Sequence, residues 1–284
     1  MKVFDSIGSI RTFLNDKRRQ GSQIGLVPTM GALHKGHFNL IELAVKKNDV
    51  VVVSIFVNPT QFNKKEDLEN YPRHLDQDIE ALKKMGCQAV FVPSENEMYP
   101  SNRALTFDVG YLEKIMEGKF RQGHFAGVAL IVTKLFNIIA PSRAYFGQKD
   151  LQQLVLIRNL VQELNIDVEI VEVPTVREAS GLAMSSRNQR LSEEDKNVAA
   201  NIYKGLQTLE NKIISGIDLD TAALEVKEFY KNIEGFELEY LEIVNKSDLL
   251  PEKDFNSYTK IALCVAGYIS GVRLLDNLCF NPKD

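Results

Sequence analysis

The sequence is poor in the residues that build disulfides and metal sites. It contains no tryptophan, only four histidines and only three cysteines in 284 residues. Cys87, Cys264 and Cys279 are odd in number, widely separated and free of any CxxC spacing. This pattern argues against a disulfide framework and against a zinc site. We therefore expect reduced, buried thiols and no metal site made by protein ligands.

Long apolar runs and an excess of positive charge are also missing. The first twenty residues are interrupted by charges and hold no apolar run long enough for a signal peptide or a membrane span. The formal net charge is −4, with 44% hydrophobic and 25% charged residues. This is the composition of an ordinary globular protein, and the net charge does not attract a polyanion. We expect a cytoplasmic protein without a membrane or nucleic acid as its partner.

Short apolar runs alternate with segments of helical periodicity up to about residue 175. Runs with strand character occupy residues 24–30, 50–57, 88–93, 144–147 and 168–174. Segments with helical spacing occupy residues 37–47, 75–86, 127–141 and 150–164. Strands separated by helices of this length are typical of right-handed crossovers. We predict an α/β domain over residues 1–175, with a doubly wound, Rossmann-like parallel sheet.

The alternation of strand-like and helical segments ends after residue 175, where a polar, serine-rich stretch begins. Two helical segments follow at 193–214 and 219–231, and two β-like runs at 238–244 and 260–269. We predict a second, smaller α+β domain over residues 176–284.

The segment PTMGALHKGH, residues 28–37, places His34 and His37 three residues apart between a predicted strand and a predicted helix. Ligands of doubly wound sheets bind at this end of the strands, where helix N-termini favour phosphate. Two imidazoles at this spacing point to the same side of the helix. By spacing alone a surface turn is the alternative, and a P-loop of the GxxxxGK[ST] type is absent. A nearby phosphate group would favour charged imidazoles, and a helix N-terminus would oppose them.

Two further polar clusters could bind phosphate. Lys149 directly follows the predicted strand 144–147, which favours a place at the same sheet edge over an ordinary surface lysine. The segment AMSSRN, residues 183–188, combines two hydroxyls with the forked donors of Arg187. A helix-capping serine pair beside a solvated arginine is the alternative for this segment.

The sequence resembles the pantothenate synthetases (pantoate–β-alanine ligases) of the HxGH nucleotidylyltransferase superfamily over most of its length. The matching blocks occur in the family's order and at about its spacing: PTMGALHKGH (28–37), FVNPTQF (56–62), EMYP (97–100), GKFRQGHFAGV (118–128), KLFNIIAPSRAYFGQKDLQQ (134–153) and GLAMSSRN (181–188). The resemblance implies ATP-dependent condensation of pantoate with β-alanine through a pantoyl-adenylate, with release of AMP and pyrophosphate. It also implies a homodimer.

The resemblance assigns roles residue by residue. His37, His34 and Lys149 are the expected catalytic residues, and Gln61 and Gln153 the expected ligands of pantoate and β-alanine. The residues expected to bind ATP are Met30, Gly31, His34, His37, Gly147, Lys149, Asp150, Val176, Met184, Ser185, Ser186 and Arg187. Mg²⁺ is expected to travel with the triphosphate, because no acidic cluster has the spacing of a protein site.

This sequence departs from the family pattern at Gln122, Gln148 and Ser180, where proline, glutamate and aspartate are usual. None of these positions has an assigned chemical role, so only local loop geometry is affected. Arg121 and His124 are equally compatible with loop scaffolding and with contact to pyrophosphate or pantoate.

Three other functions compete with the ligase. Another HxGH nucleotidylyltransferase acting on a small molecule would release a stable nucleotide conjugate and would need no amine. An aminoacyl-tRNA synthetase is disfavoured, because the sequence has no basic stripe or anticodon-binding domain. A catalytically inactive nucleotide-binding module is disfavoured by the joint presence of His34, His37, Lys149 and Arg187.

Overall fold

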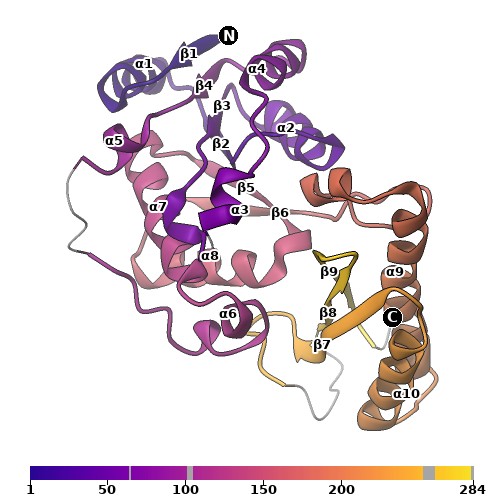
Figure 1. Ribbon diagram of the computed structural model, residues 1–284. Coiled ribbons are helices and arrows are strands. Elements are labelled where there is room, and N and C mark those ends of the chain that lie inside the picture. Colours follow the sequence, from indigo (N-terminus) through magenta and orange to yellow (C-terminus); the bar gives the residue numbers. More distant parts are fainter. Residues whose placement is uncertain (64, 101–104, 252–259, 283–284) are drawn as a thin grey trace. The chain divides into compact units, whose positions relative to one another are not determined.

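The computed structural model describes residues 1–63, 65–100, 105–251 and 260–282 (Figure 1). The chain divides into two compact units. The N-terminal unit comprises Met1–Gly147 and Gln152–Val173, and the C-terminal unit comprises Gln148–Leu151 and Pro174–Asp284. The four residues Gln148–Leu151 therefore follow the fifth strand of the N-terminal unit but pack with the C-terminal unit.

A six-stranded sheet with strand order β1-β4-β3-β2-β5-β6 forms the centre of the N-terminal unit. Its strands are β1 (Lys2–Phe4), β2 (Ile24–Thr29), β3 (Val50–Ile55), β4 (Ala89–Phe91), β5 (Arg143–Gly147) and β6 (Glu169–Val173). Every neighbouring pair is parallel. From β2 the chain proceeds to β3 and β4 on one side, and β5 and β6 lie on the other. The strand order therefore reverses between the neighbouring strands β2 and β5. The carboxyl ends of these two strands form the topological switch point, where doubly wound sheets bind their ligands.

Helices cover both faces of this sheet, which explains why the whole of β3 is buried and reads VVVVSI. Helix α2 packs against β2, β3 and β5, and α7 packs against α1 and β2. Figure 1 shows α1 and α7 on one side of the strands and α2 and α4 on the other. The helices of ten or more residues up to β6 are α1 (Ile7–Arg19), α2 (Lys35–Lys47), α4 (Leu75–Lys84), α7 (His124–Ile139) and α8 (Leu151–Glu163). Shorter helices are η1 (Pro59–Gln61), α3 (Lys65–Glu69), α5 (Glu95–Met98), η2 (Gly110–Glu113), α6 (Met116–Phe120) and η3 (Gln148–Asp150).

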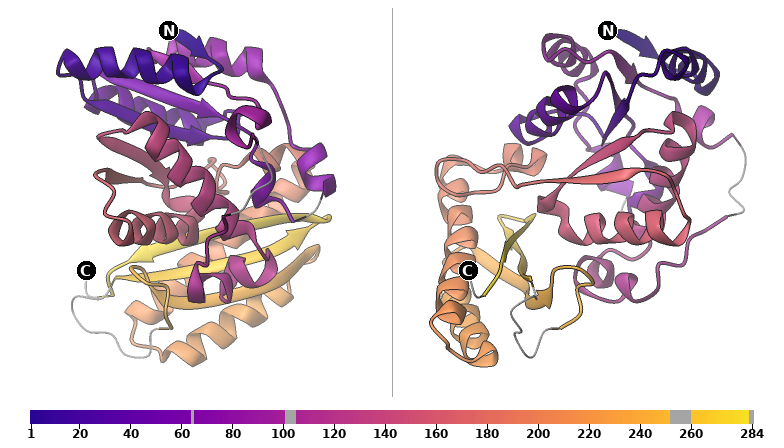
Figure 2. Two further views of the ribbon diagram at one scale, coloured as in Figure 1. Left: turned by 90° about the vertical axis from the view of Figure 1, so that its left-hand side faces the viewer. Right: turned by 180° about the vertical axis from the view of Figure 1, so that it is seen from behind.

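The C-terminal unit is a three-stranded antiparallel sheet with two long helices. The sheet has the order β7-β8-β9, with strands β7 (Phe236–Asn245), β8 (Ile261–Ile269) and β9 (Val272–Phe280). The helices of this unit after β6 are η4 (Ser186–Arg190), α9 (Glu193–Ile214) and α10 (Leu219–Lys231). Helix α9 packs against β8 and β9, and α10 packs against β7 (Figure 2). Ser192 caps α9 with Asp195 in a capping box, and Asp218 caps α10.

The predicted fold class is confirmed, and most predicted elements occur within a few residues of the expected bounds. The sequence reading missed β1, α1 and β9. Helix α1 carries a helix-start signal, because Ser6 caps it, and Ile10 and Leu14 at helical spacing are fully buried. Strand β9 follows β8 through a tight hairpin in which Ser270 and Gly271 both have positive φ, 48° and 76°. An SG pair between two apolar runs is one of the sequence signals of a turn.

All three cysteines are free. Cys87 and Cys264 are buried and Cys279 is half-buried. Burial raises the pKa of the Cys87 thiol to about 11, so this residue behaves as a small apolar side chain at neutral pH.

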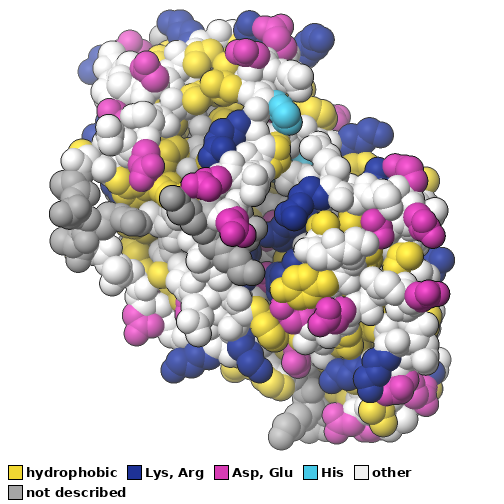
Figure 3. Space-filling view, in the orientation of Figure 1, with side chains coloured by type: hydrophobic (Ala, Val, Ile, Leu, Met, Phe, Trp, Pro, Cys, Tyr) yellow, Lys and Arg dark blue, Asp and Glu magenta, His cyan; other side chains and the backbone are white. Residues whose placement is uncertain are grey.

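The surface carries charges of both signs. On the face shown in Figure 3, acidic and basic side chains are interspersed. Over the described part of the chain, no helix has the length and apolar character that crossing a membrane requires.

Candidate active site

The two histidines of PTMGALHKGH form the N-terminal cap of α2. His34 is the N-cap residue with extended backbone, and its ring Nδ1 accepts a hydrogen bond from the N–H of Gly36 at 3.1 Å. The ring Nδ1 of His37 accepts from the N–H of His34 at 3.4 Å, which completes a capping box made of imidazoles. The two ring centroids are 4.1 Å apart. The expectation that both rings share one side of the helix N-terminus is therefore met.

This cap decides which ring atom can act on a ligand. Each hydrogen bond needs an unprotonated Nδ1, so each ring carries its N–H on Nε2. The N–H of Gly36, which would otherwise be available to an anion, is already bound to His34. One backbone N–H of this helix start is therefore used by the cap itself, and the two imidazoles lie at the same helix end, as the sequence predicted.

A buried aspartate holds the loop that precedes this cap. Asp78 on α4 is 4% exposed, and its two carboxylate oxygens accept hydrogen bonds from the N–H groups of Ala32 and Leu33, each at 2.9 Å. Gly31 and Ala32 have positive φ of 82° and 51°. A Cβ at Gly31 would lie 3.1 Å from Asp78 Oδ2, so both its backbone and its surroundings favour glycine.

The sequence analysis gave Asp78 no role, although a signal was present. The segment 75–86 is amphipathic, and Asp78 lies four residues before the buried Leu82 on its apolar face. A carboxylate on a buried helix face requires partners, and here they are backbone N–H groups of a loop 45 and 46 residues earlier.

We predict that Asp78→Asn destabilises the protein by about 1 to 3 kcal/mol, because an amide NH₂ replaces one acceptor of a buried hydrogen bond. The first chemical step should slow as well, since the loop positions His34 and His37. Urea unfolding and single-turnover kinetics measure the two effects. Asp76→Asn is the matched control, because Asp76 is exposed in the first turn of the same helix. Equal effects of the two substitutions would contradict the role of Asp78.

Gln61 follows β3 and is oriented by Asn58. Gln61 is 9% exposed and Asn58 is 1% exposed. The amide NH₂ of Asn58 donates to Gln61 Oε1 and to the carbonyl of Gly127, both at 3.1 Å, and Asn58 Oδ1 accepts from the hydroxyl of Tyr99 at 2.8 Å. With its oxygen occupied, Gln61 points its Nε2 to Met30 Sδ, 3.0 Å away. Gln61 and Met30 are thus brought together, and Asn58 is a site residue that the sequence analysis missed.

The carboxyl end of β5 provides the next predicted residues. Gly147 ends the strand, and a Cβ added there would meet no atom within 4 Å, so the space beside it is open. Gln153 is half-buried in the first turn of α8. Between them, Lys149 and Asp150 form the turn η3, where Lys149 Nζ lies 3.5 Å from Asp150 Oδ1. This ion pair is weak, because Asp150 is 53% exposed.

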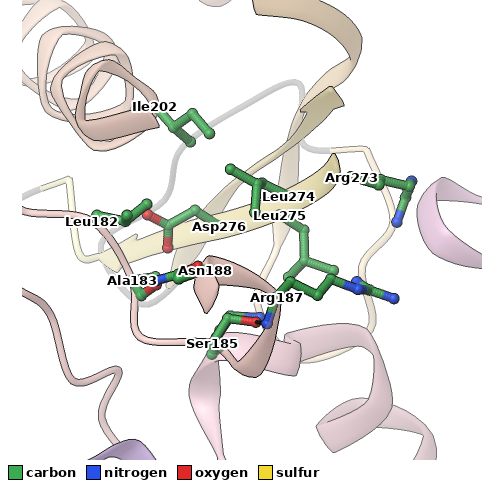
Figure 4. A pocket seen from close by; sticks show the side chains of 11 residues that line it. Leu182, Ala183, Ser185, Arg187, Asn188, Ile202, Arg273, Leu274, Leu275 and Asp276 are labelled. Atoms are coloured by element: carbon green, nitrogen blue, oxygen red, sulfur yellow. Dashed lines mark hydrogen bonds between the residues drawn. The ribbon is translucent and has the colours of Figure 1, made fainter. Parts of the chain in front are cut away.

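The C-terminal unit contains a pocket that gathers the other predicted phosphate-binding residues. Lys149, Ser185 and Arg187 line it, together with Arg273 and Asp276 of β9 (Figure 4). Arg273 is paired with Glu239. Within the described residues Arg187 forms no ion pair, so its charge is available to a ligand.

The local structure explains how the serine-rich segment is shaped. Ser185 caps the turn η4 by accepting from the N–H of Arg187 at 3.3 Å, as in the alternative interpretation of a capping serine. Ser186 and Arg187 are half-buried within that turn. The N–H of Met184 donates to the carbonyl of Val176 at 2.9 Å, which places these two predicted residues side by side. The segment is thus both a cap and a pocket wall.

Arg121 and His124 occupy different surroundings. His124 is 6% exposed, and its Nδ1 lies 2.9 Å from the carbonyl oxygen of Gln61. Arg121 is paired with Glu117 at 3.8 Å. His124 thus supports the backbone of Gln61. Among the described residues, no group of three or more His, Cys, Asp or Glu side chains could hold a metal ion.

The geometry defines a class of protein: a doubly wound α/β fold with a histidine-capped helix at its switch point and a basic pocket in a smaller unit. The family model described as pantoate-beta-alanine ligase matches residues 2–279. The pantothenate synthetase of Cytophaga hutchinsonii is 48% identical over 274 residues, covering 96% of this chain and 97% of the relative. That of Aquifex aeolicus is 46% identical over 282 residues, covering 97% of each.

Solved structures agree with this match. The crystal structure of pantothenate synthetase from Thermus thermophilus has a TM-score of 0.91 at 40% identity and covers 98% of this chain and 99% of that chain. The pantoate-beta-alanine ligase from Francisella tularensis, complexed with beta-gamma ATP and beta-alanine, has a TM-score of 0.81 at 38% identity, covering 100% of this chain and 98% of that chain. The chain belongs to the pantoate–β-alanine ligase family, and the protein is an enzyme of the ligase class.

Proposed function

We propose that the protein condenses pantoate with β-alanine to pantothenate in two steps that consume ATP. The match of the family model to residues 2–279 is the observation that carries this proposal. In the first step a carboxylate oxygen of pantoate attacks the α-phosphorus of ATP, and the bond to pyrophosphate breaks. In the second step the amine of β-alanine attacks the carbonyl carbon of the adenylate, loses a proton and displaces AMP.

In the N-terminal unit, the Nε2–H groups of His34 and His37 donate to the phosphate oxygens on which charge accumulates. Their fixed position on the helix cap supports this role, because preorganised donors need no rearrangement during the reaction. Met30, Gly31 and Gly147 border ATP, and the open space beside Gly147 suits close approach of a ligand. Gln61 and Gln153 bind pantoate and β-alanine, since an amide both donates and accepts hydrogen bonds.

In the C-terminal unit, Lys149, Ser185, Ser186 and Arg187 bind the phosphates of ATP. Their common place on the wall of one pocket supports this for Lys149, Ser185 and Arg187. Val176 and Met184 contact the adenosine part and Asp150 its ribose. Mg²⁺ accompanies the triphosphate, whose charge it neutralises.

For the two domains predicted from the sequence, we propose that residues 1–175 bind ATP and pantoate and that residues 176–284 cover the active site. We also propose that the protein is a cytoplasmic homodimer. Light scattering on the purified protein tests its oligomeric state.

We predict that the two half-reactions are separable. A mixed anhydride of pantoate and AMP is prone to hydrolysis, so a site that makes it must exclude water until the amine arrives. With ATP and pantoate alone, we expect a burst of about one pyrophosphate per active site and a retained adenylate. Steady AMP formation should begin only when β-alanine is added. Release of ADP and phosphate in place of AMP and pyrophosphate would overturn the proposed function.

A further inference from the structure

Two consecutive residues of β9, Asp276 and Asn277, are buried polar side chains for which the proposed mechanism has no use. They are 4% and 3% exposed. Both belong to the C-terminal unit; Asp276 lines the pocket that Lys149, Ser185 and Arg187 also line, and Asn277 is the next residue of the strand. Buried polar groups cost free energy unless their hydrogen bonds are made, so their partners indicate what they hold in place.

The side-chain NH₂ of Asn277 binds the turn that carries Lys149, whereas its backbone carbonyl accepts from Arg177 at 3.1 Å. The amide NH₂ of Asn277 donates to the carbonyl of Gln148 at 3.0 Å and to the carbonyl of Lys149 at 2.8 Å. Gln148 Nε2 in turn lies 3.5 Å from Asn277 Oδ1. Both N–H groups of the amide therefore bind the backbone of η3, at residues 129 and 128 positions earlier in the sequence.

The side chain of Asp276 binds Arg177, which pairs with Ala183 in the segment that forms another wall of the pocket. Arg177 binds both carboxylate oxygens of Asp276, at 2.5 Å and 3.0 Å, and also donates to the carbonyl of Gly181 at 3.1 Å. Its guanidinium stacks on the ring of Tyr203, 3.6 Å from the centroid. Residues 177 and 183 form an antiparallel bridge just before Ser185 and Arg187.

Two of the arginines near the pocket have their charges balanced by carboxylates. Burial raises the pKa of Asp276, whereas its bonds to Arg177 act in the opposite direction. Arg177 and Asp276 form an ion pair without net charge, and the charge of Arg273 is likewise balanced by Glu239. Lys149 and Arg187 remain as the cations of the pocket that can bind a ligand. The distance between them depends on two contacts of β9, that of Asn277 with the turn η3 and that of Asp276 with Arg177.

We propose that Asn277 is a positioning residue that sets the place of Lys149 relative to the segment of Ser185 and Arg187. This inference rests on the proposed function, since it concerns how the phosphates of ATP are bound. Asn277 itself does not line the pocket. It acts through the backbone of Lys149, while the neighbouring Asp276 fixes the opposite wall through Arg177.

A double-mutant cycle with Lys149 tests this proposal. In Asn277→Ala, kcat/KM for ATP should fall by about tenfold, because both hydrogen bonds that hold the turn of Lys149 are lost, while KM for pantoate stays within about twofold. In the Lys149→Ala background, adding Asn277→Ala should change kcat/KM for ATP by less than about twofold, because the residue through which Asn277 acts is already gone. Asn277→Asp, which turns an oxygen toward two carbonyls, should have the larger effect if it folds.

Asp218→Ala is the control, because it removes the cap of α10 in the same unit without touching the pocket. It should lower Tm and leave kcat/KM for ATP unchanged. An equal loss from Asn277→Ala in both backgrounds, or an equal rise in KM for every substrate, would show a merely structural role and overturn the inference. A wild-type protein that forms no AMP from ATP, pantoate and β-alanine would instead refute the proposed function.

Discussion

Replacing His37 or His34 by alanine is expected to slow formation of pantoyl-adenylate by about a hundredfold or more, the cost of removing one preorganised donor from a developing negative charge. Binding of pantoate and ATP should change less, because the charge that the donor stabilises grows only toward the transition state. Single-turnover measurement of the adenylate reports this step directly. A near wild-type rate in either variant would refute the catalytic role.

The capping box makes a sharper control available. His34→Ala also removes an N-cap, which by itself costs about 1 kcal/mol of stability. In His34→Asn the side-chain oxygen can take the place of Nδ1 and accept from the N–H of Gly36, but the amide does not reach the position of Nε2. We expect His34→Asn to regain most of the stability that alanine loses and little of the rate. Recovery of both would mean that His34 acts only as a helix cap.

Lys149→Ala should lower kcat/KM for ATP by about ten- to a hundredfold, the range for loss of hydrogen bonds from a charged group, and should affect pantoate far less. The side chain of Lys149 is only 18% exposed and lines the pocket with Arg187, so its charge is held close to any phosphate bound there. Initial rates with each substrate varied in turn measure the effect.

Lys231→Ala serves as the matched control for Lys149→Ala. Lys231 lies in the same unit, is 63% exposed and pairs with Glu228 on the surface of α10. Its removal deletes the same charge far from the pocket residues named above, so kcat/KM for ATP should remain unchanged. Retention of kcat/KM for ATP within a few fold in Lys149→Ala would remove this lysine from the phosphate-binding set.

Local sequence determined the elements and the chemical character of the first motif. Five of the six parallel strands were predicted. The central strand β3 is the clearest case, because a strand covered on both faces reads as a nearly continuous apolar run. The cap of α2 was also within reach, since spacing alone places His34 and His37 on one side of a helix start. Strand β1 was missed because a three-residue edge strand with two exposed side chains has no such signature.

Only the tertiary structure decided which distant residues hold these segments in place. Three contacts join parts of the chain that no local pattern relates. Asp78 binds the N–H groups of Ala32 and Leu33, Asn58 binds the carbonyl of Gly127, and Asn277 binds the turn of Lys149. The strand order, with β1 beside β4 and β5 beside β2, likewise depends on long-range pairing. Periodicity reports which face of an element is buried, whereas the identity of a buried polar partner is set by packing between elements.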